Sequence, residues 1–210
     1  MTRATRSPLA HTVVEVVGRP FEAVWSPEDG VLRAGGFVGP GSGSGSGSRS
    51  ELFARLAVAD PAFAARGLAP ERAETGEIPD ALRDYAGGEL DALDAIRVSQ
   101  PGTPFRAAVW EALRRVPAGR AVTYTELAGL AGRPRAVRAA ASGCANNLVA
   151  LVVPCHRIVR SDGGLGGYLF GVETKELLLA HEGARPAGAS SRLEGPIRGI
   201  ESAGRPHSGL

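Results

Sequence analysis

The sequence is poor in cysteine, with only Cys144 and Cys155 among its 210 residues. Two cysteines cannot form the dense disulfide framework of a small secreted domain. Clusters of cysteine and histidine at zinc-ligand spacing are also absent, so we expect no metal site and no cofactor. A free thiol persists in a reducing compartment, and this predicts an intracellular, cytoplasmic protein.

Long hydrophobic runs are also missing. No segment approaches the roughly 20 apolar residues that cross a bilayer, and residues 1–8 are polar rather than the start of a signal peptide. We therefore expect no membrane partner. The hydrophobic fraction of 43% is ordinary for a globular chain, and the length is sufficient for one large domain or two small ones.

The small net charge of +2 conceals an uneven distribution. Residues 1–100 carry ten basic and fourteen acidic side chains, a net charge of −4, whereas residues 101–182 carry ten and six, a net charge of +4. The second half is therefore the one that suits a polyanionic partner. A solvated basic face with no partner would produce the same modest imbalance.

The first half predicts a small α/β domain over residues 11–100. Residues 1–10 are expected to be a flexible lead-in, followed by an antiparallel sheet with strands at 11–17, 21–26 and 31–38. A glycine-serine loop at 39–48 has no means of packing. Helices are expected from residue 50 and over 79–90, and a last strand over 96–99.

The second half, residues 101–183, predicts a mainly α-helical domain. Thr103 is an N-cap before proline, and residues 123–126 form a capping box before a short helix. A further helix over 135–146 follows a glycine-containing turn, which is the helix-turn-helix pattern, although an ordinary helical hairpin has the same pattern. A final helix over 172–182 ends at Gly183, and residues 184–210 are expected to be a disordered tail.

Cys155 and His156 stand side by side after Pro154 and an apolar run at 148–153. A cysteine is a strong nucleophile as the thiolate, and a neighbouring base is the usual means of producing it. A lone cysteine would more often be a small buried hydrophobe, which is our interpretation of Cys144. A cysteine hydrolase that uses a Cys-His pair is a further possibility.

Motifs in order over residues 102–183 resemble those of the methylated-DNA–protein-cysteine S-methyltransferases, the O6-alkylguanine repair proteins. The resemblance is strongest to the C-terminal half of the bacterial adaptive-response protein, while residues 10–100 match the family's N-terminal domain only in outline. The matching motifs are Gly-Thr-Pro-Phe (102–105), Val-Trp-Glu-Ala-Leu (109–113), Thr-Tyr-Thr-Glu-Leu-Ala (123–128), Val-Arg-Ala (137–139), Asn147, Pro-Cys-His-Arg (154–157), Leu-Gly-Gly-Tyr (165–168) and Lys-Glu-Leu-Leu-Leu-Ala-His-Glu (175–182).

The resemblance implies a reaction and a role for five residues. Cys155 would accept the alkyl group from O6 of guanine, and also from O4 of thymine. His156 would take the thiol proton through a bridging water, and Glu182 would orient His156. Tyr168 would support the departing guanine with its hydroxyl, and Asn147 would brace the link between the second helix and the Cys155 turn. The thioether is stable, so each molecule would react once.

The resemblance also implies alkylated double-stranded DNA as the partner, bound through the minor groove by a nucleoid-associated monomer. Arg138 would enter the base stack in place of an everted nucleotide, and Tyr124 would press on the adjoining phosphate. Arg135 would contact the backbone. Each of these residues also has an ordinary interpretation, as a surface arginine or a packing tyrosine, and Glu182 could be a solvated residue at a helix end.

Two departures from the family pattern bear on function. Residues 169–171 are Leu-Phe-Gly where smaller residues are common, and this bulk could narrow the alkyl pocket. The metal-binding cysteines of the adaptive-response sensor domain are missing, so transcriptional activation is not expected. The main alternative function is that of the alkyltransferase-like proteins, which bind the lesion without transferring it. Those proteins lack the reactive cysteine, so Cys155 argues against this alternative.

Overall fold

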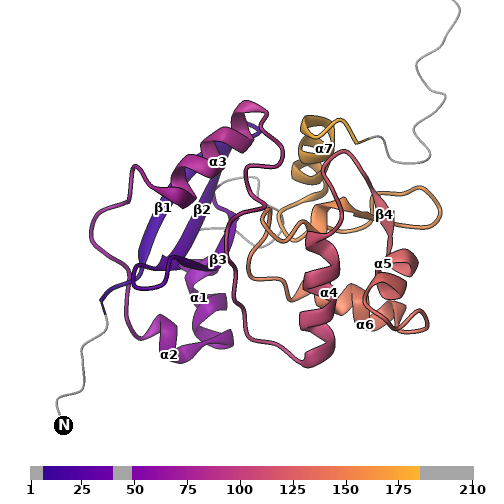
Figure 1. Ribbon diagram of the computed structural model, residues 1–210, viewed down its shortest axis with the longest axis horizontal. Coiled ribbons are helices and arrows are strands. Elements are labelled where there is room, and N and C mark those ends of the chain that lie inside the picture. The colour runs from indigo at the N-terminus through magenta and orange to yellow at the C-terminus, as the bar shows by residue number, and fades with distance from the viewer. Residues whose placement is uncertain (1–6, 40–48, 185–210) are drawn as a thin grey trace, which may run out of the picture.

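The computed structural model describes residues 7–39 and 49–184 (Figure 1). The predicted glycine-serine loop and tail fall almost entirely outside these ranges, as do residues 1–6 of the predicted lead-in. Residues 7–10 are described, and Leu9 is fully buried, with backbone hydrogen bonds to Gly67 and Ala69. Ordered structure thus begins before residue 11, because burying Leu9 offsets the cost of fixing this part of the chain.

The N-terminal half contains the antiparallel sheet that the sequence predicts. Its strands β1 (Ala10–Val16), β2 (Arg19–Ser26) and β3 (Val31–Phe37) are hydrogen-bonded in that order. The turn between β1 and β2 contains Gly18 at φ 72°, a left-handed conformation that glycine adopts without strain. All three predicted strands are confirmed to within two residues.

Helices cover both faces of this sheet (Figure 1). Helix α3 (Glu77–Gly87) packs on the face that carries Phe21 and Ala23, whereas α1 (Arg49–Ala59) packs on the opposite face with Val24 and Ala34. Neighbouring residues of β2 therefore point into different layers, and residues 21–24 are all buried. A short helix, α2 (Pro61–Ala64), follows α1.

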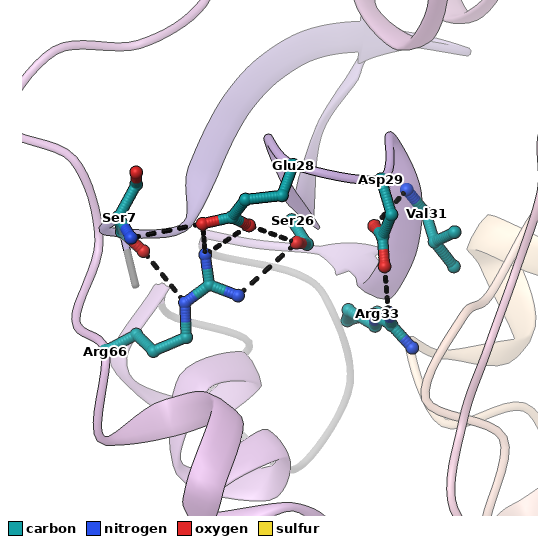
Figure 2. Close-up of polar contacts among 7 residues, drawn as sticks. All are labelled: Ser7, Ser26, Glu28, Asp29, Val31, Arg33 and Arg66. Carbon is teal, nitrogen blue, oxygen red and sulfur yellow. Dashed lines mark hydrogen bonds and ion pairs between the residues drawn. The ribbon is translucent and has the colours of Figure 1, made fainter. Parts of the chain in front are cut away.

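Polar contacts fasten the turn after β2 to the segments around it (Figure 2). Arg66 donates hydrogen bonds to both carboxylate oxygens of Glu28, at 2.7 and 2.6 Å, and to the carbonyl oxygen of Ser7 at 2.8 Å. Hydrogen bonds from Ser26 and Arg66 lower the pKa of Glu28 to about 2. Asp29 of the same turn pairs with Arg33 of β3. The network is structural and lies at the end of the sheet where β1 begins and β2 ends.

The predicted strand over 96–99 is wrong. Only Val98 forms a bridge, to Leu32, through hydrogen bonds from the Leu32 amide to Arg97 and from the Ser99 amide to Leu32. The segment joins the edge of β3 at one point because residues 91–95 form turns and Pro101 follows closely. Proline has no amide proton to donate to a ladder, so the pairing cannot continue past it.

The C-terminal half is mainly helical, as predicted. It contains α4 (Pro104–Arg114), β4 (Val122–Thr123), α5 (Tyr124–Leu130), α6 (Val137–Ala145), the 3₁₀ turn η1 (Cys155–Arg157), β5 (Ile158–Val159) and α7 (Val172–His181). Thr103 caps α4 and the Thr123–Glu126 capping box opens α5, both as predicted. The helix expected from residue 135 begins two residues later and lacks a side-chain cap, since no Ser, Thr, Asp or Asn precedes it.

The apolar run before Cys155 joins the two halves. Gly35 in β3 receives the amide hydrogen bond of Ala150 and donates its own to Leu148, at 2.9 and 2.8 Å. A Cβ at Gly35 would lie 2.9 Å from the ring of Phe21, so the packing of that ring against β3 depends on glycine at this position. One hydrophobic cluster contains buried residues of both halves. The segment leading to Cys155 is therefore fixed by the N-terminal sheet. No helix within residues 7–39 and 49–184 is both long and apolar enough to traverse a bilayer.

Candidate active site around Cys155

Cys155 begins the turn η1 and is partly buried, and its sulfur receives a hydrogen bond from Asn147. The Asn147 amide nitrogen lies 3.3 Å from Sγ and 2.8 Å from the carbonyl oxygen of Val153. Its oxygen accepts hydrogen bonds from Gln100 Nε2 at 3.0 Å and from the Val149 amide at 3.1 Å. Because the two donors occupy the oxygen, the NH₂ group must face the sulfur. Asn147 thus contacts the thiol itself as well as bracing the turn.

His156, the residue after Cys155, forms a fully buried pair with Glu182. His156 Nε2 lies 2.9 Å from Glu182 Oε1, and both side chains are 0% exposed. The carboxylate favours a proton on Nε2, which leaves Nδ1 as an acceptor. Nδ1 is buried and has no hydrogen-bond partner within the described part of the chain. It therefore has the free lone pair that a base requires, although no direct hydrogen bond joins it to Sγ.

Glu182 is not the solvated residue that its place at a helix end allows. Arg157 donates to both of its oxygens, at 2.8 and 3.0 Å, and Tyr85 of α3 donates to Oε1 at 2.8 Å. Burial raises the pKa of Glu182, but the hydrogen bonds from His156 and Arg157 outweigh it and hold the pKa well below its usual value. Glu182 is therefore ionised at neutral pH.

The same burial keeps the neighbouring groups neutral. Burial lowers the pKa of His156, and the Glu182 carboxylate offsets this only in part. Burial raises the pKa of Cys155, against the opposing effects of the Asn147 hydrogen bond and of the Lys175 and Arg55 charges. A cysteine nucleophile reacts as the thiolate, whereas the raised pKa of Cys155 favours the protonated thiol near neutral pH. Any nucleophilic role for this sulfur therefore requires a base to take the thiol proton.

A cavity of about 250 Å³ opens beside Cys155. This is below the roughly 300–1,000 Å³ typical of pockets for drug-sized ligands and suits a single planar ring system with a small substituent. Ala141 and Ala145 of α6 form part of its wall, and Leu169 and Phe170 lie in the segment before α7. The remaining lining residues are Tyr124, Cys144, Asn147, Cys155, Gly167 and Tyr168.

Two tyrosines contribute to the cavity wall. The Tyr168 hydroxyl is buried and without a hydrogen-bond partner among residues 7–39 and 49–184, and burial raises the pKa of Tyr168 well above its usual value. The hydroxyl is thus a protonated donor available to a ligand. Tyr124 is half-buried at the start of α5, and burial also raises its pKa.

The sequence expectations for the other wall residues are partly corrected. Cys144, expected in the core, does pack against the core cluster, but it is only partly buried and also lines the cavity. Burial raises the pKa of its thiol. The bulk at 169–171 does reach the cavity. Leu169 remains 45% exposed, and the Phe170 ring packs edge-on against Phe37 and Tyr168, with centroids 5.7 and 5.4 Å away.

The two predicted DNA-contacting arginines lie outside the cavity. Arg138 is in the first turn of α6, whereas Arg135 lies in the turn before it and not in the helix as expected. Both are exposed. Helices α5 and α6 pack against each other across the turn at 131–136. The structure therefore brings Cys155, His156, Glu182, Tyr168, Asn147 and Tyr124 together, and leaves the two arginines on the adjoining surface.

Several residues of the site were not predicted. Arg157 and Lys175 belong to the quoted motifs, but no role was assigned to them. Tyr85, Gln100 and Arg55 come from the N-terminal half, and Arg55 donates to the carbonyl oxygen of Asn147 at 3.2 Å. No local pattern marks these three residues, because their contacts exist only once the halves pack. Within the described residues, no group of three or more His, Cys, Asp or Glu could hold a metal ion.

The second half of the chain matches a known protein family. Residues 104–184 match the family described as 6-O-methylguanine DNA methyltransferase, DNA binding domain. This part of the chain is therefore similar to the DNA-binding domain of that family. The match includes all of the cavity wall and every member of the Cys155 site except Tyr85, Gln100 and Arg55.

Individual relatives show the same similarity. The chain is 44% identical over 108 residues to the methylated-DNA–protein-cysteine methyltransferase of Salmonella typhimurium, covering 51% of this chain and 63% of that protein. It is 53% identical over 81 residues to the bifunctional transcriptional activator/DNA repair enzyme Ada of Escherichia coli, covering 39% and 23%. The chain thus spans less than two thirds of the length of these relatives.

The fold is similar over a larger part of the chain. The crystal structure of Mycobacterium tuberculosis OGT in complex with DNA superimposes with a TM-score of 0.61 and 26% identity, covering 82% of this chain and 92% of that one. The O6-methylguanine methyltransferase fold therefore extends into the N-terminal sheet and its helices. The three-stranded sheet with helices is confirmed as part of this architecture.

Proposed function

We propose that this protein repairs DNA by moving an alkyl group from O6 of guanine onto Sγ of Cys155, once per molecule. The observation that carries the proposal is the joint placement of Cys155 and Tyr168 on one base-sized cavity. Asn147 contacts the sulfur there, and the next residue in the chain, His156, forms a buried pair with Glu182. A nucleophile on a cavity, with a base next to it in the chain and a carboxylate that orients the base, supplies the parts required for covalent group transfer.

The bonds and protons of this step balance without a cofactor. A bond forms between Sγ and the alkyl carbon while the bond from that carbon to O6 breaks. The thiol proton passes through a bridging water to Nδ1 of His156, whose Nε2 is held by Glu182. Tyr168 donates its hydroxyl hydrogen bond to the departing guanine as negative charge develops on the base. The guanine then takes up one proton from water on a ring nitrogen, and His156 returns the thiol proton to water, so that no proton is gained or lost overall. The thioether product has no means of hydrolysis at the site, so turnover stops.

The substrate is alkylated duplex DNA, bound through the minor groove by a monomer. The alkylated oxygen is inside the duplex, so the nucleotide has to be turned out into the cavity. Helices α5 and α6 act as a helix-turn-helix, with the small residues of α6 close to the groove. Arg138 fills the space in the base stack, Tyr124 presses on a phosphate and Arg135 contacts the backbone. O4-alkylthymine, which presents a similar oxygen, is a second substrate.

Mass spectrometry after incubation with a duplex that contains O6-methylguanine tests the transfer. The peptide with Cys155 should gain about 14 Da, one equivalent per chain, and Cys155→Ala should abolish the adduct. Cys144→Ala shows which of the two cavity thiols is alkylated, because the adduct should still form on Cys155 in this variant. An adduct that persists in Cys155→Ala would refute the assignment.

The same experiment separates transfer from binding alone. A lesion-binding protein would retain the modified duplex in a gel-shift assay and leave both thiols unmodified. Arg138→Ala should weaken duplex binding and slow the transfer, while its reaction with the free methylated base should match that of the wild type. Equal loss with both substrates would remove Arg138 from the DNA-contacting role.

A further inference from the structure

The relay carboxylate Glu182 is held by a residue from outside the matched family domain. Tyr85 lies in α3, its side chain is fully buried, and its hydroxyl donates to Glu182 Oε1 at 2.8 Å. The same oxygen lies 2.9 Å from His156 Nε2. Helices α3 and α7 lie beside each other in Figure 1, and Glu182 directly follows α7. The N-terminal half thus contacts the reactive relay through one hydroxyl group.

We propose that Tyr85 is a positioning residue for alkyl transfer, whose hydroxyl fixes the Glu182 carboxylate against the imidazole of His156. The inference rests on the proposed function and extends it to the N-terminal half. Arg157 grips the carboxylate from η1 through both oxygens, at 2.8 and 3.0 Å, and Tyr85 reaches it from α3. Two donors from different elements leave the carboxylate no freedom to rotate away from His156.

A second contact joins Tyr85 to the end of α7. His181 Nε2 lies 2.8 Å from the carbonyl oxygen of Tyr85, and the two rings pack edge-on with centroids 5.1 Å apart. Residues 181 and 182 of the chain therefore contact the backbone and the hydroxyl of one tyrosine. Burial raises the pKa of Tyr85, so the hydroxyl remains a donor throughout the pH range of an assay.

The Tyr85 hydrogen bond also affects the proton affinity of His156. The charged or titratable groups around His156 are Glu182, Arg157, Lys175 and Cys155, with the Tyr168 ring at 6.4 Å. Tyr85 acts through Glu182, because each hydrogen bond donated to the carboxylate reduces its attraction for a proton on the imidazole. Removal of the hydroxyl makes the carboxylate more basic and raises the pKa of His156. Neutral His156 then predominates only at a higher pH.

Tyr85→Phe tests the proposal, since it removes the hydroxyl and keeps the ring. The single-turnover transfer rate from an O6-methylguanine duplex should fall about tenfold near neutral pH. The acid limb of its pH profile should move to higher pH, and ring-nitrogen NMR of His156 should show a matching rise in pKa. Asp84→Asn, on the exposed side of the same helix, should retain the wild-type transfer rate and the wild-type position of the acid limb.

His181→Leu controls for a loss of packing between α3 and α7, because it removes the backbone contact and leaves the hydroxyl of Tyr85 in place. It should lower Tm without moving the acid limb. If Tyr85→Phe slows transfer but leaves both the limb and the His156 titration unchanged, its role is structural only and the proposal is overturned. An unchanged rate overturns it as well. If the wild type itself transfers nothing, the proposed function fails first, and the role of Tyr85 fails with it.

Discussion

The side-chain amide of Asn147 donates to Sγ of Cys155 over 3.3 Å, and its orientation is set in part from the other half of the molecule. Gln100, before α4, donates to the amide oxygen together with the Val149 amide, and this leaves the NH₂ group to face the sulfur. The amide hydrogen bond lowers the pKa of Cys155, against the larger opposing effect of burial. In the proposed transfer, Asn147 would stabilise the thiolate as it forms.

Asn147→Ala should slow alkyl transfer by about tenfold or more, because the developing thiolate loses a hydrogen bond worth roughly 1.5–3 kcal/mol. The pKa of Cys155, followed by its reaction with iodoacetamide across pH, should rise further. Asn146→Ala is the matched control, since Asn146 is exposed, directly follows α6 and donates from its side chain to Ser142 of that helix. Equal rates of thiol alkylation in the two variants would contradict a role for Asn147 at the sulfur.

Glu182→Gln should destabilise the protein by about 3–5 kcal/mol, because it leaves the buried guanidinium of Arg157 without its counter-charge. The pKa of Glu182 is lowered in the folded state, so its contribution to stability is present above the unfolded pKa of about 4.3 and is lost as the pH falls through the folded value. Thermal unfolding of the wild type and the variant between pH 3 and 7 measures both effects. Glu176→Gln, exposed on α7, should change Tm little.

Local features of the fold could be predicted because their causes lie within a few residues. The Thr103 cap and the Thr123–Glu126 capping box each satisfy backbone groups of the helix that they open, and both are present. The alternating strands of the sheet are likewise confirmed. The strand expected over 96–99 fails because a short apolar run contains no information about whether a neighbouring edge continues alongside it.

The candidate site was predictable only where its residues share a motif. Cys155 and His156 are adjacent, and the resemblance supplied Glu182. Tyr85 and Gln100 reach the site from the other half, and no spacing in the sequence indicates which face of α3 meets α7. The raised pKa of Cys155 could not be predicted from the sequence either, because it results from burial by residues distant along the chain.

Lys175, the single lysine of the chain, should resist amine-reactive reagents in the folded state. Its side chain is fully buried, and Nζ donates to the carbonyl oxygens of Ile158 and Leu165. Burial lowers the pKa of Lys175 to about 8, below the unfolded value of about 10.4. The unfolded chain therefore binds more protons between these values, and stability should rise with pH across that window.

Lys175→Met should abolish the rise in stability between these pH values, and it keeps most of the side-chain volume. Chemical unfolding at pH 8 and at pH 10 gives the change in the free energy of unfolding for the wild type and for the variant. Subtracting the variant's change from that of the wild type removes the contributions of the tyrosines and cysteines that both proteins share. Acetylation followed by mass spectrometry provides an independent measure, with rapid labelling of Lys175 only in denaturant. Rapid labelling of the native protein would show that the side chain is not buried as described.

Gly36→Ala should destabilise the fold and disturb the cavity together. A Cβ on Gly36 would lie 2.8 Å from the ring of Phe170, and Phe170 lines the cavity beside Cys155. Overpacking of this kind costs about 1–3 kcal/mol, and a shift of the Phe170 ring would disturb its edge-on contacts with Phe37 and Tyr168. Gly129→Ala, in α5 with open space around the new methyl group, should instead stabilise the protein by about 0.5–1 kcal/mol. Thermal unfolding and the rate of methyl transfer are measured for each variant. A Gly36→Ala protein with wild-type Tm and rate would mean that β3 and Phe170 are less tightly coupled than their contact implies.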